Sequence, residues 1–235
     1  MNPLTGYTAT VSFVKNLAGD YYHGRFELKE PSSIDFIAGQ YVVFQIGPPK
    51  LRHTLSITSP PQEPNRIEVL QSIAPHGEGS KWLTSLKEGD SVQFLGPVGK
   101  FTLQKTTPKQ KVFVATGCGI APLRSMLADY LGFSGGVPVV LYWGLRFESD
   151  LFWQEELAAL AAAHSNFHYF VTLSKPTDGW RGMKGRVTDH VVDHVPGLLE
   201  SEFYLCGNRE MIVEVRKQLM DAGVAGEQIF TETFF

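Results

Sequence analysis

Short apolar runs separated by glycine and proline fill roughly the first hundred residues of the chain. Runs of this kind, rich in β-branched and aromatic residues, predict β-strands. The predicted strands span residues 7–14, 23–28, 40–45, 66–71 and 91–95. A helical pattern is confined to residues 80–87 in this half. Many short strands with regular turns between them predict an antiparallel barrel or sandwich.

After residue 110 the pattern changes to strands that alternate with helices. The predicted strands span residues 112–114, 137–143, 167–173, 202–206 and 228–233. Helices are predicted from a cap at Ser149 or Asp150 to residue 163, and over residues 209–220 with Gly223 closing the second one. Such alternation predicts a parallel, doubly wound sheet. We therefore expect an antiparallel β-barrel domain (residues 1–105), a linker (106–110) and an α/β domain (111–235).

The composition is that of a globular protein, with 43% apolar and 19% charged residues and a formal net charge of −3. This charge gives no reason to expect nucleic acid as a partner. No apolar run approaches the ~20 residues that a spanning helix needs. The first residues also lack the basic and apolar regions of a signal peptide. We expect a cytoplasmic protein that does not insert into membranes.

The chain has two cysteines, Cys118 and Cys206, which lie far apart in the sequence. An iron–sulfur cluster on four thiolates, or a cysteine-rich zinc site, cannot be built from them. His190 and His194 are four residues apart but have no glutamate between them, unlike the histidines of zinc-binding helices. We therefore expect no metal site, and any iron–sulfur centre would belong to another protein.

A glycine-rich turn follows the predicted strand at residues 112–114. Gly117 and Gly119 permit a tight turn, and Pro122 is favourable in the first turn of a helix. The N–H groups at such a helix start bind anions, above all phosphates. The dinucleotide fingerprint is incomplete, because Pro122 stands where its third glycine is expected, so a plain strand–turn–helix joint remains the alternative.

Several further segments extend this pattern over nearly the whole chain. In order they are Arg52–Ser59, Gly77–Leu83, Gly96–Phe101, Thr116–Pro122, Tyr142–Arg146 with Asp150 and Leu151, Trp180–Val187, Cys206–Met211 and Glu232–Phe235. The ordered set resembles the ferredoxin–NADP reductase superfamily of two-domain flavoenzymes. The resemblance implies that the first domain binds FAD and the second binds NAD(P)H.

The family's flavin strand carries Arg-x-Tyr-Ser, and Ser56 fits its serine, which contacts the flavin N5 edge. Leu55 then falls where the tyrosine lies on the flavin ring, so an aliphatic side chain would cover that face. His53 stands at the position of the family's arginine, and Arg52 comes one residue before it. Thr54 is the variable residue between the arginine and tyrosine positions. Either a bulge lets Arg52 reach the pyrophosphate, or His53 and backbone groups bind it. An ordinary edge strand is the alternative.

Two phosphate sites follow from the resemblance. Gly77, Gly79 and Ser80 precede or open the predicted helix of the first half, where their N–H groups and the Ser80 hydroxyl would cap the helix and bind the FAD pyrophosphate. A bare helix cap is the alternative. In the second half, the turn of Gly117 and Gly119 would hold the pyrophosphate of the nicotinamide dinucleotide.

The residues expected around the nicotinamide come from three segments. Thr116 and Pro122 flank the glycine turn, while Cys206 opens a segment that includes Gly207 and Met211. In the family this cysteine lies near nicotinamide C4, Glu232 helps to order the site, and a terminal aromatic such as Phe235 moves aside for the nicotinamide. A buried inert cysteine, and aromatic rings at Phe234 and Phe235 that only anchor the last strand, are the alternatives. We expect Ser56, Cys206, Glu232 and Phe235 to act as placement and electrostatic residues.

Cations near the adenosine ribose should decide between NADH and NADPH, because a 2′-phosphate calls for Arg or Lys. The candidates are Arg146, Ser174 and Lys175, together with Arg181. The Ser174-Lys175 pair lacks the Ser-Arg sequence of relatives that strongly prefer NADPH, which slightly favours NADH.

The predicted activity is therefore hydride transfer from NAD(P)H to FAD, followed by electron transfer to a separate acceptor. Ferredoxin, flavodoxin, an oxygenase component or a small molecule such as free flavin could accept the electrons. Two alternatives are a flavin-bearing electron-transfer subunit of a larger redox complex and a flavin-free nucleotide-binding module. Such subunits often carry an added cysteine cluster, which this chain lacks.

Overall fold

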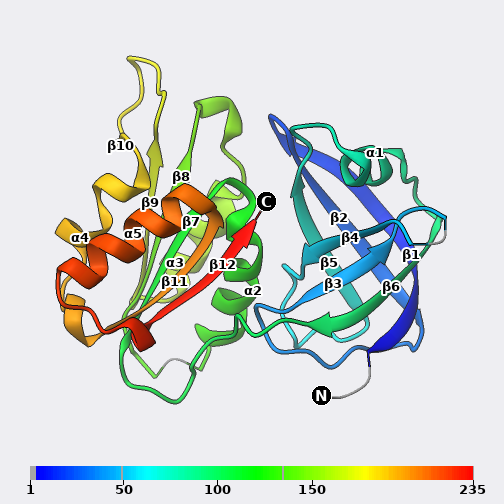
Figure 1. The fold of residues 1–235 in the computed structure, drawn as a ribbon, viewed down its shortest axis with the longest axis horizontal. Helices are drawn as coiled ribbons and strands as arrows, with labels where there is room; N and C mark the ends of the chain where they lie inside the picture. Colours follow the sequence, from blue (N-terminus) through cyan, green and yellow to red (C-terminus); the bar gives the residue numbers. More distant parts are fainter. Residues whose placement is uncertain (1–3, 49, 134, 235) are drawn as a thin grey trace. The chain divides into compact units, whose positions relative to one another are not determined.

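The computed structural model describes residues 4–48, 50–133 and 135–234, and the chain forms two compact units (Figure 1). Unit 1 contains the residues up to Leu103 together with Arg124–Asp129, and unit 2 contains Gln104–Leu123 and the residues from Tyr130 onward. The domain bounds drawn from the sequence stay a prediction.

Unit 1 is built on one antiparallel sheet. Its strands are β1 (Thr5–Ala18), β2 (Tyr21–Glu30), β3 (Tyr41–Gln45), β4 (Arg52–Ser56), β5 (Arg66–Ser72) and β6 (Ser91–Val98), in the order β4-β3-β6-β1-β2-β5. A bridge between Ile57, directly after β4, and Val69 of β5 joins the two edges of the sheet. The sheet therefore closes into the predicted antiparallel barrel.

The barrel core consists of the side chains that alternate inward along these strands. Phe26, Phe44 and Phe94 are almost fully buried and lie ring to ring, with centroids 5.1 and 5.3 Å apart. Helix α1 (Glu78–Ser85) adds Leu83, which is fully buried in the same core. The helix begins two residues before the predicted start at Ser80, because Gly77 is its N-cap.

Unit 2 is built on a parallel sheet, as predicted. Its strands are β7 (Gln110–Thr116), β8 (Val139–Leu145), β9 (Phe167–Leu173), β10 (Met183–Lys184), β11 (Ser201–Asn208) and β12 (Ile229–Phe234), in the order β10-β9-β8-β7-β11-β12. β8 has only buried residues, as expected for a strand covered on both faces. The sequence did not predict β10, which is two residues long.

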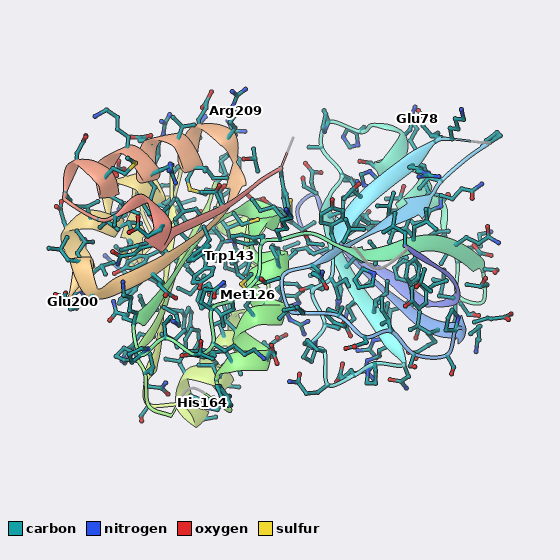
Figure 2. All side chains as sticks on the ribbon, turned by 60° about the horizontal axis from the view of Figure 1, so that its bottom comes forward. Glu78, Met126, Trp143, His164, Glu200 and Arg209 are labelled. Atoms are coloured by element: carbon teal, nitrogen blue, oxygen red, sulfur yellow. The ribbon has the colours of Figure 1, made fainter. Side chains whose placement is uncertain are left out.

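Helices cover the parallel sheet. They are α2 (Ile120–Tyr130), α3 (Gln154–Ala163), α4 (Val191–His194) and α5 (Arg209–Asp221), with 3₁₀ turns at Gly117–Gly119, Glu148–Asp150, Val187–Asp189, Leu198–Glu200 and Gly226–Gln228. Helices α4 and α5 pack on one face of the sheet (Figure 1). On the other face, Lys111 Nζ lies over the Tyr130 ring of α2, 5.9 Å from its centroid. Arg209 opens α5 after Asn208, whose side chain accepts a hydrogen bond from Glu210 N at 2.7 Å (Figure 2).

The predicted start of α3 is wrong. The helix begins at Gln154, with Trp153 at its N-cap in the left-handed region (φ 52°). The Asp150 carboxylate instead accepts a hydrogen bond from Phe147 N at 3.1 Å and closes the 3₁₀ turn at Glu148–Asp150. An Asp that caps a single turn has the same sequence signature as one that caps a helix.

Candidate active site

Strand β4, which is predicted to carry the flavin, pairs regularly with β3. Each of its five residues lies opposite one residue of β3 without a register shift, from Ser56 opposite Tyr41 to Arg52 opposite Gln45. A bulge would place two residues opposite one. The alternative in which a bulge in β4 brings Arg52 to the phosphates is therefore wrong.

The two faces of β4 differ in polarity. Leu55 is 6% exposed and belongs to the barrel core, as does Val42 opposite it. Because side chains alternate along a strand, Arg52, Thr54 and Ser56 share the opposite, outward face. The Leu55 side chain is therefore held in the core, and its predicted place against the flavin ring stays a prediction. Thr54 takes the outward position two residues after Arg52.

The first turn of α1 is free of side-chain caps. Its N-cap, Gly77, has no side chain to accept a hydrogen bond, so the first N–H groups of the helix point out of its end. The Ser80 hydroxyl does not cap the helix as predicted. It is 6% exposed and accepts a hydrogen bond from Gln71 Nε2 at 3.3 Å. The helix start thus keeps donors and a partial positive charge for an anion.

In unit 2 the predicted glycine turn is a 3₁₀ turn between β7 and α2. Gly117 has a positive φ of 52°, and its carbonyl accepts a hydrogen bond from the fully buried Trp143 Nε1 at 3.0 Å (Figure 2). A Cβ atom at Gly119 would overlap the carbonyl oxygen of Cys206. Pro122 lies in the first turn of α2, as predicted. Glycine is required here because the backbones of two segments touch.

A second glycine joins the ends of β7 and β11. Gly207 has a φ of 135°, and a Cβ atom there would overlap the Thr116 hydroxyl. The same Thr116 Oγ1 accepts a hydrogen bond from Asn208 N at 2.9 Å. The two turns therefore interlock at the carboxyl ends of neighbouring parallel strands, which is where open α/β sheets bind their ligands.

Cys206 lies at the base of these turns and is fully buried. In the sheet it pairs with Ala115 on one side and with Glu232 on the other. Burial raises the pKa of the Cys206 thiol well above its ordinary value, and the charges of Glu232 and Cys118 raise it further. The thiol is therefore neutral at pH 7, which suits a placement residue and argues against a nucleophile.

A cavity of about 500 Å³ lies at the carboxyl ends of β8 and β9. It is lined by Arg146, Ser174, Lys175, Gly185, Arg186, Asp189 and Glu214. The sequence predicted the first three as a group, and hydrogen bonds from Ser174 N to Leu145 O and from Lys175 N to Arg146 O hold the two segments together. Arg186 was missed, although it lies in the Trp180–Val187 segment. Arg181, also a candidate, does not line the cavity.

The remaining predicted residues differ in their surroundings. Met211 is 5% exposed and packs in the hydrophobic core between α5 and the sheet, so its predicted contact with the dinucleotide stays a prediction. Phe235, the predicted gate, lies outside the described residues. Phe234 is the last residue of β12, opposite Asn208.

Comparison with known proteins decides the family. An oxidoreductase FAD-binding domain matches residues 8–103, and an oxidoreductase NAD-binding domain matches residues 113–217. Ferredoxin–NADP reductase B of Sorangium cellulosum is 31% identical over 218 residues, which are 89% of this chain and 89% of that protein. The chain belongs to the ferredoxin–NADP reductase superfamily.

Two further proteins similar to this chain are reductases with longer chains. The reductase component of propane 2-monooxygenase from a Gordonia species is 30% identical over 237 residues, which cover 99% of this chain and 68% of that protein. A crystal structure of a cytochrome P450 reductase from Amycolatopsis covers 100% of this chain and 71% of its own, with a TM-score of 0.92 and 29% identity. The two-domain fold class is thereby confirmed.

As a member of this superfamily, the protein is a flavin-dependent oxidoreductase with FAD and NAD(P)H as its cofactors. It passes a hydride from NAD(P)H to FAD and electrons onward to a redox partner. The residues that the structure describes fit both cofactors, FAD and NAD(P)H. The starts of α1 and of the 3₁₀ turn at Gly117–Gly119 have no side-chain cap, so each offers N–H donors to a pyrophosphate.

The described part of the chain holds neither a membrane-spanning helix nor a cluster of metal ligands. Residues 4–48, 50–133 and 135–234 contain no helix that is both long and apolar enough to cross a membrane. Nor does this part of the chain bring together three His, Cys, Asp or Glu side chains that could hold a metal ion. The cytoplasmic location stays a prediction.

Proposed function

We propose that the protein oxidises NADH at the turns that end β7 and β11, and that FAD bound along β4 and α1 passes the electrons to a separate redox protein. Ferredoxin, flavodoxin or an oxygenase component is the proposed class of acceptor. The observation that carries the proposal is the pair of interlocked glycine turns at Gly119 and Gly207, where the backbone and the Thr116 side chain leave no space for a Cβ atom. The 3₁₀ turn that contains Gly119 also has no side-chain cap, so its first N–H groups remain to bind a phosphate.

The chain's own residues position the reactants. Thr116 Oγ1 already accepts a hydrogen bond from Asn208 N, so its hydroxyl hydrogen remains to donate to the bound dinucleotide. Ser56 lies on the face of β4 opposite Leu55 and is only 5% exposed, and its hydroxyl is the group proposed to meet the flavin edge. The Cys206 thiol, which the family resemblance puts near nicotinamide C4, would add no charge there because it is neutral. When bound, FAD supplies the chemistry that accepts a hydride and releases electrons one or two at a time.

Transfer of electrons to a protein acceptor is tested with purified components. The protein reconstituted with FAD is mixed with NADH and with ferredoxin or flavodoxin, and NADH oxidation is followed by absorbance. We expect oxidation that accelerates with acceptor concentration, and a slower rate in Ser56→Ala. Ser85→Ala, an exposed serine at the far end of α1, is the control. A rate of NADH oxidation that does not depend on any protein acceptor would contradict this part of the proposal. A partner that copurifies in a fixed ratio would instead favour the alternative of an electron-transfer subunit in a larger redox complex.

The preference for NADH rests on the cavity at the carboxyl ends of β8 and β9. Three cations line it, but Asp189 and Glu214 line it as well and offset their charge. Three cations against two carboxylates leave a net charge of +1, which is less than the charge of about −1.5 to −2 that a 2′-phosphate carries. The carboxylates can instead accept hydrogen bonds from the ribose hydroxyls of NADH. This balance of charges supports NADH as the preferred donor.

Charge reversal at Lys175 tests the preference. We expect Lys175→Glu to lower kcat/KM for NADPH more than tenfold and to change the value for NADH by less than about threefold, since only NADPH carries the phosphate. Lys217→Glu, an exposed lysine of α5 outside the cavity, is the matched control. An unchanged ratio in Lys175→Glu would remove Lys175 from the site.

A further inference from the structure

His53 has an inward position on β4 that the flavin site has not yet explained. It lies opposite Phe44, on the same face of the strand as the buried Leu55. Its ring lies against Gly79 of α1, where a Cβ atom would stand 2.5 Å from the ring atoms Cε1 and Nδ1. Gly79 is therefore a glycine because the His53 ring fills the space that any larger residue would need.

A buried polar chain connects the same histidine to the start of α1. Gln71 of β5 is 8% exposed and donates a hydrogen bond from Nε2 to Ser80 Oγ at 3.3 Å. Its Oε1 and His53 Nε2 are both buried and have no partner within hydrogen-bond geometry among the described residues. Gln71 also raises the His53 pKa as a hydrogen-bond partner, so the two side chains are neighbours. A neutral ring with its proton on Nε2 would supply the donor that Gln71 Oε1 needs.

We propose that His53 is a positioning residue for the FAD pyrophosphate. Its ring fixes Gly79 by direct contact, and it fixes the Ser80 hydroxyl through Gln71. The inference rests on the proposed binding of FAD at the start of α1. Direct binding of the phosphates by His53 stays a separate prediction. As a positioning residue, His53 holds the first helical turn so that the N–H groups beyond Gly77 converge on the phosphates.

The protonation state of His53 agrees with this role. Burial lowers the pKa of His53 below its ordinary value, and the hydrogen bond with Gln71 offsets only part of this effect. The ring is therefore neutral at pH 7 and adds no positive charge to the interior. A neutral ring also fits beside a helix start, whose partial positive charge would repel a cation.

The test compares FAD with riboflavin, which has the same ring system and no phosphate. Affinities are measured by quenching of flavin fluorescence for the wild-type protein, His53→Leu and His53→Gln. We expect His53→Leu to weaken FAD binding about tenfold and to leave riboflavin binding unchanged, because the loss of an aligned phosphate contact costs about that factor. His53→Gln keeps a donor toward Gln71 and should retain most of the FAD affinity. Equal losses for both ligands, or none, would overturn the inference.

A second measurement does not depend on riboflavin affinity or on the folding of His53→Leu. Gly79→Ala in the wild-type background should weaken FAD binding, because its Cβ atom meets the His53 ring. The same substitution in a His53→Ala background should cost nothing further, since the ring is gone. Additive losses in this cycle would contradict the inference. A wild-type protein that binds no FAD would instead contradict the proposed function itself.

Discussion

Gly119 is the residue at which one added methyl group should matter most. Its Cβ atom would meet the carbonyl of Cys206, which is held in β11 and cannot move aside. We expect Gly119→Ala to lower the free energy of unfolding by about 1–3 kcal/mol and to abolish measurable NADH binding. Gly132→Ala is the control, because nothing lies within 4 Å of a Cβ atom there. Urea unfolding and NADH titration would measure both, and equal losses in the two variants would contradict the role of the turn.

The two cysteines should react at very different rates. Cys206 is fully buried and its thiol has a raised pKa, so little of it is thiolate and no reagent reaches it. Cys118 is partly exposed. We expect iodoacetamide at pH 8 to label Cys118 in the native protein and to spare Cys206 until the chain is unfolded. Mass spectrometry of the labelled peptides checks this, and rapid native labelling of Cys206 would show that the site opens.

At the scale of single elements, an ion pair joins the neighbouring strands β7 and β11. Lys111 is fully buried, and its Nζ lies 2.7 Å from Glu202 Oε2, which also accepts a hydrogen bond from the Tyr204 hydroxyl at 3.1 Å. Burial lowers the pKa of Lys111, and the attraction of Glu202 opposes the shift. Removal of either charge leaves the other uncompensated in the interior.

A double-mutant cycle measures this pair. We expect Lys111→Met alone to lower the free energy of unfolding by about 3–5 kcal/mol, because it leaves the Glu202 carboxylate buried without its partner. Lys111→Met combined with Glu202→Leu should recover most of the loss. Lys217→Met is the control, since its pair with Asp221 is exposed. A double variant less stable than Lys111→Met would contradict this account of the strands.

The elements themselves were largely predictable from the sequence. The run at residues 167–173 has the bounds of β9, because an apolar, aromatic-rich strand in a parallel sheet leaves a continuous signal. The start of α3 and the two-residue β10 were not predictable, since local turn chemistry and sheet pairing decide them. Helix α1 also begins at Glu78, two residues before its predicted start, with Gly77 as its N-cap.

The site was predictable where glycines or cations mark it and less so along β4. Arg146, Ser174 and Lys175 converge as expected, because the carboxyl ends of parallel strands share one edge. The role of Leu55 was taken from the family register and stays a prediction, although its side chain packs in the barrel core. The alternation of polar Arg52, Thr54 and Ser56 with Leu55 already indicates which face is outward. Arg186 carried no separate signal in the sequence.

At the scale of the whole molecule, acid should unfold the protein in part through Glu68. Burial alone would raise the Glu68 pKa, but His23, Arg124 and Arg25 outweigh it and lower the pKa to about 2. A carboxylate with a lower pKa in the folded state stabilises the fold above its unfolded pKa, and this contribution is lost as the pH falls. We therefore expect the free energy of unfolding to decrease between about pH 4.5 and pH 2.

Urea unfolding at a series of pH values measures this dependence. Glu68→Gln should be less stable than the wild-type protein at pH 7 and should show a shallower decrease below pH 4.5, because the titrating group is gone. Glu78→Gln, in an exposed pair with Lys81, is the control and should follow the wild-type profile. Parallel profiles for the wild type and Glu68→Gln would contradict the assignment.

The measurement that tests the central claim most directly is an anaerobic titration of the FAD-loaded protein with NADH, followed by its visible spectrum. A flavin that receives a hydride loses its yellow absorption, so we predict that about one equivalent of NADH bleaches the protein. The Gly119→Ala variant, loaded with FAD in the same way, should stay yellow. A protein that cannot be loaded with FAD, or one that binds FAD and stays yellow in excess NADH and excess NADPH, would contradict the account.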